Sequence, residues 1–173
     1  RLDAETDVIE LKDGTLYAAQ RTEKESMRFS KSTDGGKTWK NVGLKKTFQT
    51  GKVIVHPTNP DVVYVGALGR LYGDNEDRGV FKTEDGGKTW KKVHDLNDKT
   101  GVSDMRMDPT DPNTLIAGYW EHKRDEHDGF FGTPPVPDSY GPVVTHGPGG
   151  GLYKTTDGGK KWTKLTDEKL KNG

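Results

Sequence analysis

The sequence predicts an all-β fold: a β-propeller made of four-stranded antiparallel blades, of which this chain of 173 residues supplies three. Three observations lead to this prediction. One turn motif recurs at residues 32–39, 83–90 and 155–162. Two further segments, 55–66 and 107–118, repeat each other's pattern of a polar turn followed by an apolar strand. Finally, the 23 glycines suit a chain with many tight turns and disfavour long helices.

The repeated motif has the residue types that a tight hairpin requires. Its first copy reads Ser-Thr-Asp-Gly-Gly-Lys-Thr-Trp over residues 32–39. The Asp carboxylate can accept hydrogen bonds from backbone N–H groups of its own turn, and the glycines can adopt positive φ. The Trp begins the next strand as a large apolar anchor. The structural positions of the three copies are Asp34, Gly36 and Trp39, then Asp85, Gly87 and Trp90, and then Asp157, Gly159 and Trp162.

This motif resembles the Asp box, or BNR repeat, of sialidases, sortilin-type receptor domains and related β-propellers. In those families the box is a structural turn and not a catalytic one, so the resemblance implies a fold and hardly restricts function. Residues 69–78 together with 55–68, followed by the Gly-Val-Phe-Lys-Thr-Glu-Asp-Gly-Gly-Lys-Thr-Trp run at 79–90, look like blades of BNR-repeat glycosyl hydrolases and sortilin-like proteins. This resemblance covers about two thirds of the chain and brings no known catalytic residue with it.

Turn signals divide each repeat into four short strands. Asp13-Gly14 marks the first turn of blade one, and Pro-containing turns at 57–61 and 109–113 mark the corresponding turns of blades two and three. The expected strands are 6–11, 16–21, 27–32 and 39–44 in blade one; 52–56, 62–68, 79–83 and 90–93 in blade two; and 102–107, 114–120, 152–155 and 162–165 in blade three.

We expect one partial propeller domain over residues 1–173. Blade one covers 1–48, blade two covers 49–98 and blade three covers 99–168, with a loop insertion at 121–150 and a short tail at 169–173. Propellers typically close with four to eight blades, so three cannot form a ring alone. Either further blades of a longer propeller complete the ring, or copies of the chain associate. Two copies would supply six blades.

Composition argues against several classes of partner. The 27 Lys and Arg residues balance the 27 Asp and Glu residues, so no net field draws the chain to nucleic acid or to an anionic membrane. No segment has the apolar length of a membrane span. Neither a cofactor nor a metal is expected. The insertion does hold residue types that can ligate a divalent ion, but without the spacing of a metal motif: His122, Asp125, His127, Asp128 and His146.

Binding is expected on one face of the disc. If the strands of a blade are lettered A to D from the centre, the Asp boxes lie in the C–D connections and share a face with the short A–B turns. The B–C and D–A connections lie on the opposite, loop-rich face, at 22–26, 45–51, 69–78, 94–101 and 121–150. Long loops on a rigid scaffold are where binding usually resides. The candidate ligand-binding residues there are Arg70, Tyr72, Tyr119, His122 and Tyr140.

The opening segment, residues 5–21, resembles a different part of the Asp-box families. It is similar to the sialidase segment in which a Glu partners the nucleophilic Tyr and a following strand pair delivers one arginine of the carboxylate-binding triad. By that resemblance Glu5 and Arg21 would be catalytic residues of a sialidase-like site. The family's Arg-Ile-Pro motif and its Asp general acid belong to blades that this chain lacks. A complete site is therefore not encoded here.

Three functional hypotheses are open at this point. The first is an Asp-box propeller module, non-catalytic or catalytically incomplete, that binds glycan or polypeptide through the loop-rich face. The family resemblance implies an extracytoplasmic setting for it, secreted or periplasmic. The second is a sialidase-like glycoside hydrolase that other blades or an oligomer partner complete. The third is a purely structural repeat scaffold, natural or engineered.

Overall fold

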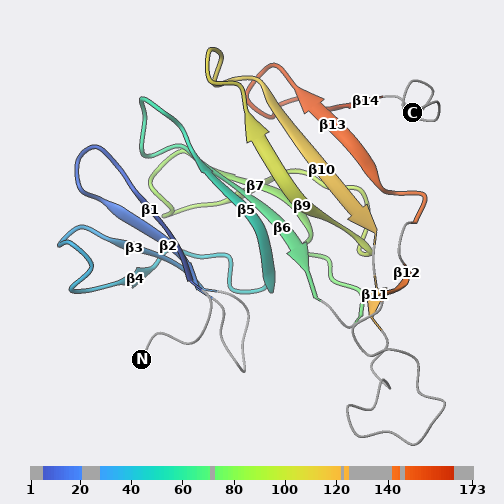
Figure 1. The fold of residues 1–173 in the computed structure, drawn as a ribbon, viewed down its shortest axis with the longest axis horizontal. Helices are drawn as coiled ribbons and strands as arrows, with labels where there is room; N and C mark the ends of the chain where they lie inside the picture. Colours follow the sequence, from blue (N-terminus) through green and yellow to red (C-terminus); the bar gives the residue numbers. More distant parts are fainter. Residues whose placement is uncertain are drawn as a thin grey trace, which may run out of the picture.

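The computed structural model describes residues 6–20, 28–70, 73–121, 123–124, 142–144 and 147–165. Three four-stranded antiparallel sheets form the blades of a partial propeller, and one further strand pair lies beside them (Figure 1). The all-β prediction is confirmed, because every regular element in these ranges is a β-strand. Within the same ranges, no helix is long and apolar enough to cross a membrane.

Each blade uses its four strands in chain order, and neighbouring strands run antiparallel. Blade one consists of β1 (Thr6–Glu10), β2 (Leu16–Gln20), β3 (Arg28–Ser32) and β4 (Lys40–Asn41). Blade two consists of β5 (Gln49–Val55), β6 (Val63–Gly69), β7 (Gly79–Thr83) and β8 (Lys91–His94). Blade three consists of β9 (Thr100–Met107), β10 (Leu115–Glu121), β13 (Gly151–Thr155) and β14 (Thr163–Leu165). All the predicted strands are present, with ends no more than three residues from the expected ones.

The insertion in blade three contains a strand pair that the sequence did not predict. β11 (Lys123–Arg124) and β12 (Pro142–Val144) run antiparallel, with Lys123 opposite Val144. The chain leaves β10 and returns to β13, and these two strands are themselves paired. The two ends of the insertion therefore lie next to each other, and the short pair β11–β12 forms between them. The expectation of loop alone at 121–150 is corrected in this respect.

Alternation along the central blade divides the core into two layers. Successive side chains of a strand point to opposite faces, so the apolar strand β6 packs against blade one on one face and against blade three on the other. Its residues Val63, Val65 and Ala67 pack against blade one, in a cluster with Tyr17, Phe29, Val42 and Phe81. Tyr64 packs against blade three, in a cluster with Val80, Val102, Met105, Leu115, Ala117 and Tyr119. We call these two contacts junction 1–2 and junction 2–3.

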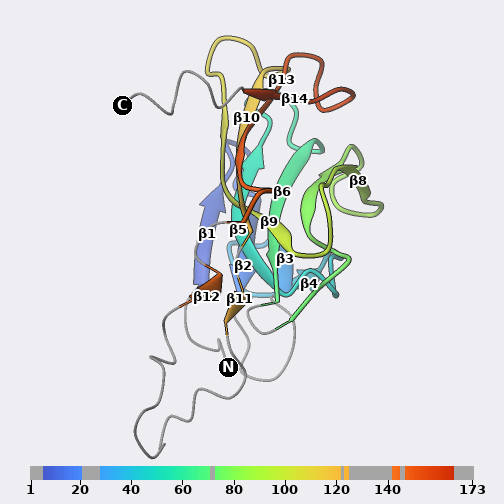
Figure 2. The same ribbon diagram turned by 90° about the vertical axis from the view of Figure 1, so that its right-hand side faces the viewer.

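The two faces of the disc lie at opposite ends of the view in Figure 1. The A–B turns, which follow β1, β5 and β9, lie toward the upper left, and β6 and β10 end toward the lower right, on the side of β11 and β12. Figure 2 shows the same molecule from the side, with β1 and β5 nearer one edge and the outer strands β4 and β8 nearer the other. The loop-rich face is therefore the lower end of Figure 1, where the B–C connections begin.

Candidate functional site

The Asp boxes of blades one and two are built alike. In box one, Ser32 Oγ donates to Asp34 Oδ1 at 2.8 Å and accepts the Gly36 N–H at 3.0 Å. Asp34 Oδ1 also accepts the Thr38 N–H at 2.9 Å, and Asp34 Oδ2 accepts the Thr38 hydroxyl at 2.5 Å. Box two repeats each of these bonds with Thr83, Asp85, Gly87 and Thr89. Each carboxylate therefore closes its own turn.

Box three differs because Lys161 stands where the other boxes have a threonine. Asp157 accepts the Thr155 hydroxyl and the N–H groups of Lys160 and Lys161, each at 2.9 Å. The hydroxyl bonds of Thr38 and Thr89 are the largest cause that lowers the pKa of Asp34 and Asp85 to about 2. The pKa of Asp157 is also lowered, mainly by the Lys161 N–H.

Acceptor chemistry of this kind extends beyond the boxes. Hydrogen bonds also lower the pKa of four other carboxyl groups. Each accepts from a nearby donor: Asp13 from Thr15, Glu84 from Lys82, Asp108 from Thr110 and Asp111 from Thr114. Among the described residues, every carboxyl group whose pKa is displaced is displaced downward. A general acid that works near neutral pH needs a raised pKa. These carboxylates are therefore suited to holding turns, and not to donating a proton.

The box tryptophans differ in what they bind. Trp39 and Trp162 donate Nε1–H to a carbonyl of their own turn, that of Gly36 at 3.0 Å and that of Gly159 at 3.2 Å. Trp90 instead donates to the Val42 carbonyl of blade one at 2.6 Å. The Trp90 ring also meets Phe29 of blade one edge-on, so it joins the two blades.

The loop-rich face carries an exposed arginine held on an aromatic ring. Arg70 follows β6, and its guanidinium lies 4.5 Å from the centroid of the Phe48 ring. Phe48 precedes β5 and forms a bridge with Gly69, which places the two side chains on adjacent backbone. Phe48 and Leu44 have φ values of 55° and 58°, a left-handed conformation that costs a non-glycine residue about 1–2 kcal/mol. The connection from blade one to blade two is thus held in a strained shape beside Arg70.

A buried arginine, Arg78, holds the loop-rich face together from within. It is 1% exposed. Its guanidinium donates to the carbonyls of Asp98 at 2.8 Å, Arg70 at 2.9 Å and Gly73 at 3.1 Å, and also to that of Leu68. Burial lowers the pKa of Arg78, and the charges of Asp74 and Asp98 oppose that effect. Sequence reasoning placed residues 69–78 on the loop-rich face but did not single out Arg78. Its one local signal is a charged residue directly before the apolar strand β7.

Tyr119, a predicted ligand-binding residue, lies inside junction 2–3 and is 5% exposed. Its hydroxyl is 2.6 Å from His94 Nδ1 and 3.3 Å from the His94 carbonyl oxygen. The rings of Tyr153 and Trp162 pack on the same imidazole. Burial raises the pKa of the Tyr119 hydroxyl and lowers the pKa of His94. The structure gives Tyr119 a packing role, because its hydroxyl is used between the blades.

The other predicted site residues, Glu5, Arg21, Tyr72, His122 and Tyr140, lie outside the described residues, as do Asp125, His127, Asp128 and His146. Of the predicted ligand-binding set, the structure describes Arg70, which is exposed, and Tyr119, which is buried in junction 2–3. In the part of the chain that the structure describes, no group of three or more His, Asp or Glu side chains is arranged to hold a metal ion.

Two clefts open along junction 1–2 on the side of the boxes. A cleft of about 990 Å³ separates boxes one and two, and its lining includes Lys31, Trp39, Asn41, Glu84 and Lys88. A cleft of about 730 Å³ separates the A–B turns of the same blades, and its lining is mainly apolar, including Ile9, Leu11, Val53, Val55 and Pro57. Sequence reasoning did not predict either cleft, because both depend on how two blades sit against each other.

Comparison with known proteins extends this picture. The family model described as "Sortilin, neurotensin receptor 3" (Sortilin-Vps10) matches residues 27–172. A probable oligoxyloglucan-reducing end-specific xyloglucanase of Neosartorya fischeri is 27% identical over 165 residues, which cover 78% of this chain and 20% of that protein. The chain therefore spans about a fifth of the length of this curated relative.

Solved structures show the same fold. An ancestral GH74 enzyme superposes with a TM-score of 0.59 at 22% identity, over 94% of this chain and 18% of the enzyme. The α-L-arabinofuranosidase Arb93A of Fusarium graminearum superposes with a TM-score of 0.52 at 22% identity, over 94% of this chain and 47% of the enzyme. At such identities the likeness shows the fold alone. The resemblance of the repeats to Asp-box propellers is confirmed.

Proposed function

The chain belongs to the Sortilin-Vps10 family, and its blades are part of a propeller related to glycoside hydrolases; on this basis we propose that they bind glycan through the loop-rich face. The proposed role is recognition, without a catalytic site complete within this chain. Arg70, stacked on Phe48, is the residue that we expect to contact the ligand.

The observation that carries the proposal is the exposed Arg70 guanidinium over the half-buried ring of Phe48, a residue whose backbone is strained. Backbone strain of this kind is stored where the surrounding structure over-determines it, and such sites are often functional. The guanidinium carbon of Arg70 lies 4.5 Å from the Phe48 ring centroid, a cation–π contact that restricts the side chain. Arg78 binds the Arg70 carbonyl at 2.9 Å and fixes the backbone beneath it. A planar set of preoriented donors suits sugar hydroxyls and, in bidentate form, a sugar carboxylate.

Glycan is favoured over polypeptide by what the relatives are. One is named a probable oligoxyloglucan-reducing end-specific xyloglucanase and another an α-L-arabinofuranosidase, so both names are those of carbohydrate-active enzymes. The box carboxyl groups are not proposed as catalytic groups, because each one accepts the hydrogen bonds that close its own turn. A location outside the cytoplasm follows only from family resemblance and is part of the same proposal.

The test combines binding with turnover. The chain is screened against neutral xyloglucan and arabinan oligosaccharides and against uronic-acid and sialic-acid glycans, and positive ligands are titrated by calorimetry. We expect saturable binding, no hydrolysis, and at least a tenfold loss of affinity for Arg70→Ala. Arg106→Ala is the matched control, since Arg106 is an exposed arginine on blade three with Asp104 as its ion-pair partner at 3.2 Å.

Each other outcome has a defined meaning. Lys88→Ala tests the cleft between boxes one and two, so a loss confined to Lys88→Ala moves the site to the opposite face and refutes the role of Arg70. If the chain binds only peptides, the ligand of the loop-rich face is a polypeptide and not a glycan. Hydrolysis of a sialoside that Arg21→Ala abolishes supports the sialidase-like alternative instead. If the chain binds none of the probes, the result supports the hypothesis of a purely structural repeat scaffold.

A further inference from the structure

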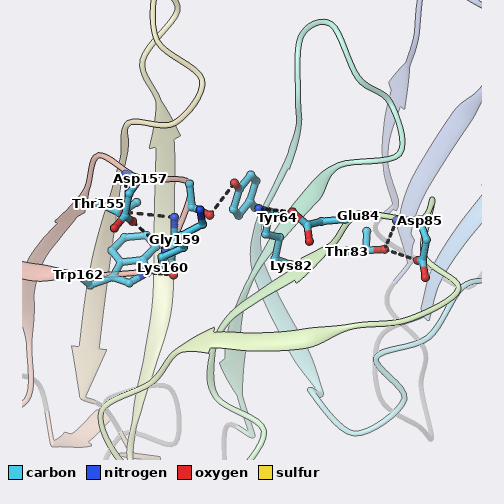
Figure 3. Close-up of polar contacts among 11 residues, drawn as sticks. Tyr64, Lys82, Thr83, Glu84, Asp85, Thr155, Asp157, Gly159, Lys160 and Trp162 are labelled. Carbon is cyan, nitrogen blue, oxygen red and sulfur yellow. Dashed lines mark hydrogen bonds and ion pairs between the residues drawn. The ribbon is translucent and has the colours of Figure 1, made fainter.

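Junctions 1–2 and 2–3 use equivalent residues but do not make the same hydrogen bonds. In junction 2–3, Tyr64, the second residue of β6, donates its hydroxyl to the carbonyl of Gly158 in box three at 3.0 Å (Figure 3). The second residue of β2, Tyr17, is 1% exposed, and its hydroxyl has no partner in the part of the chain that the structure describes. No equivalent bond therefore joins blade one to box two, and the cleft of about 990 Å³ opens between boxes one and two.

The lysine beside each of these tyrosines also has a different environment. In blade two, Lys82 pairs with Glu84, with 2.7 Å between Nζ and Oε1 (Figure 3). Lys31 is the equivalent lysine of blade one, but Thr33 stands where blade two has the glutamate. The ion pairs within the described residues join other side chains and leave Lys31 without a carboxylate at ion-pair distance. Its ammonium lies over the Tyr17 ring, 5.3 Å from the centroid.

The cleft gathers lysines from both of the blades that form its walls. They are Lys31, Lys40, Lys45 and Lys88. Two carboxylates of the same lining are already in use: Asp85 accepts the bonds that close box two, and Glu84 pairs with Lys82. In the described part of the chain, the cleft therefore has more unpaired ammonium groups than unpaired carboxylates.

The remaining carboxylate of this lining, Asp61, lies near Lys31 without pairing with it. A Cβ built at Gly86 would be 2.9 Å from Asp61 Oδ1 and 3.4 Å from Lys31 Nζ, so both groups border the same turn of box two. Junction 2–3 has Asn113 at the position of Asp61, because each of the two carbonyls accepts the N–H of the first glycine in its box. Asp61 therefore offsets part of the Lys31 charge and leaves the ammonium donors available to a third group.

We propose that the cleft between boxes one and two is a second ligand site, which binds an acidic glycan through carboxylate or sulfate groups that pair with Lys31 and its neighbouring lysines. A cleft lined by charges of one sign focuses the field and attracts anions, and lysine ammonium groups bind anionic oxygens as point charges. Thr33 and Asn41 add hydroxyl and amide groups to the lining, which can exchange hydrogen bonds with sugar hydroxyls. The choice of a glycan over an acidic peptide rests on the proposed function, whereas the site lies on the opposite face from Arg70.

The experiment titrates the chain by calorimetry with a sulfated oligosaccharide and with the same oligosaccharide without sulfate. We expect the sulfated form to bind at least about tenfold more tightly, with an affinity that falls as the salt concentration rises. Thr33→Glu supplies the glutamate that blade two has, so it is expected to pair with Lys31 and to weaken this binding at least about tenfold. The bonds that close box one do not use the Thr33 side chain, so the variant keeps its turn. Thr156→Glu is the matched control, because it adds the same charge at the same exposed position of box three, away from the cleft.

Asp61→Asn provides a test in the opposite direction. It gives junction 1–2 the residue that junction 2–3 has in Asn113, and it is expected to tighten the binding of the sulfated oligosaccharide because it removes the carboxylate beside Lys31. A weaker affinity in Asp61→Asn would mean that the ligand donates hydrogen bonds to this carboxylate, and it would overturn an anion site. Equal losses in Thr33→Glu and Thr156→Glu, or equal binding of the two oligosaccharides, would overturn it as well.

The same titrations separate this proposal from the role of Arg70. Arg70→Ala tests the loop-rich face with neutral oligosaccharides, and Thr33→Glu tests the cleft with the sulfated one. If the sulfated oligosaccharide loses affinity in Arg70→Ala but not in Thr33→Glu, it binds on the loop-rich face, so the cleft site is refuted and the proposed function stands. An oligoglutamate peptide that binds more tightly than the sulfated oligosaccharide, with the same loss in Thr33→Glu, would refute the choice of a glycan.

Discussion

Replacing Tyr64 by phenylalanine removes one hydroxyl from junction 2–3 and leaves the ring in place. The side chain is 2% exposed, and its hydroxyl donates to the Gly158 carbonyl of the next blade at 3.0 Å. Losing a buried hydrogen bond costs about 1 kcal/mol, and about 1–3 kcal/mol where the remaining partner is left without a donor. Tyr64→Phe is therefore expected to lower the free energy of unfolding by about 1–3 kcal/mol.

Tyr17→Phe is the matched control, because Tyr17 holds the same position in β2 and is 1% exposed. In the part of the chain that the structure describes, its hydroxyl is buried without a hydrogen-bond partner. Removing it is expected to be neutral or stabilising. Both variants are measured by urea unfolding, followed through the fluorescence of the four tryptophans. Equal losses for the two variants would refute the assignment of the Tyr64 bond to the junction.

Two further predictions concern the same junctions. Gly87→Ala places a Cβ 2.8 Å from the Val42 Cβ, so it is expected to destabilise the chain by about 1–3 kcal/mol more than Gly14→Ala, whose added Cβ would have nothing within 4 Å. Both glycines have positive φ, 88° and 79°, so the comparison by urea unfolding cancels the backbone strain, and equal losses would contradict the close packing. For His94, burial lowers the folded pKa below the unfolded value of 6.5, against the opposing charge of Asp95. The unfolded chain then binds more protons, so stability is expected to fall as the pH drops from about 6.5 toward the lower folded value. Melting temperatures across this range check it, and a slope that persists in His94→Gln would exclude His94 as its source.

The Asp boxes could be predicted from the sequence because their bonds are local. Each side-chain bond within box one joins residues no more than four positions apart, as between Ser32 and Gly36. A turn whose hydrogen bonds join only neighbouring residues can be predicted without knowledge of the rest of the chain. The strands flanking the boxes could be predicted for a similar reason, since turn residues and the alternation of apolar residues mark them locally. The missing threonine in box three, at Lys161, is equally visible in the sequence.

The junctions could not be predicted, because their bonds join distant residues. Trp90 binds a carbonyl 48 positions away, and Tyr64 binds one 94 positions away. Nothing in the repeated motif says that Trp90 leaves its own turn while Trp39 does not. The packing of Tyr119 on His94 has the same origin: Tyr119 lies near the end of β10, where a side chain could also face solvent, and only the neighbouring blade shows it to be buried. Arg78 was missed because its partners are backbone carbonyls, which leave no pattern of side chains to read.

The proposed binding surface and the junctions depend on each other. Phe48 belongs to the connection between blades one and two, whereas Arg70 belongs to blade two. Arg78 ties the carbonyl of Arg70 to that of Asp98, which begins the approach to blade three. The donors of Arg70 are thus fixed by contacts that span the connections between all three blades. Any change that tightens junction 1–2 should reduce the conformational freedom that the Arg70 side chain loses when it binds a ligand.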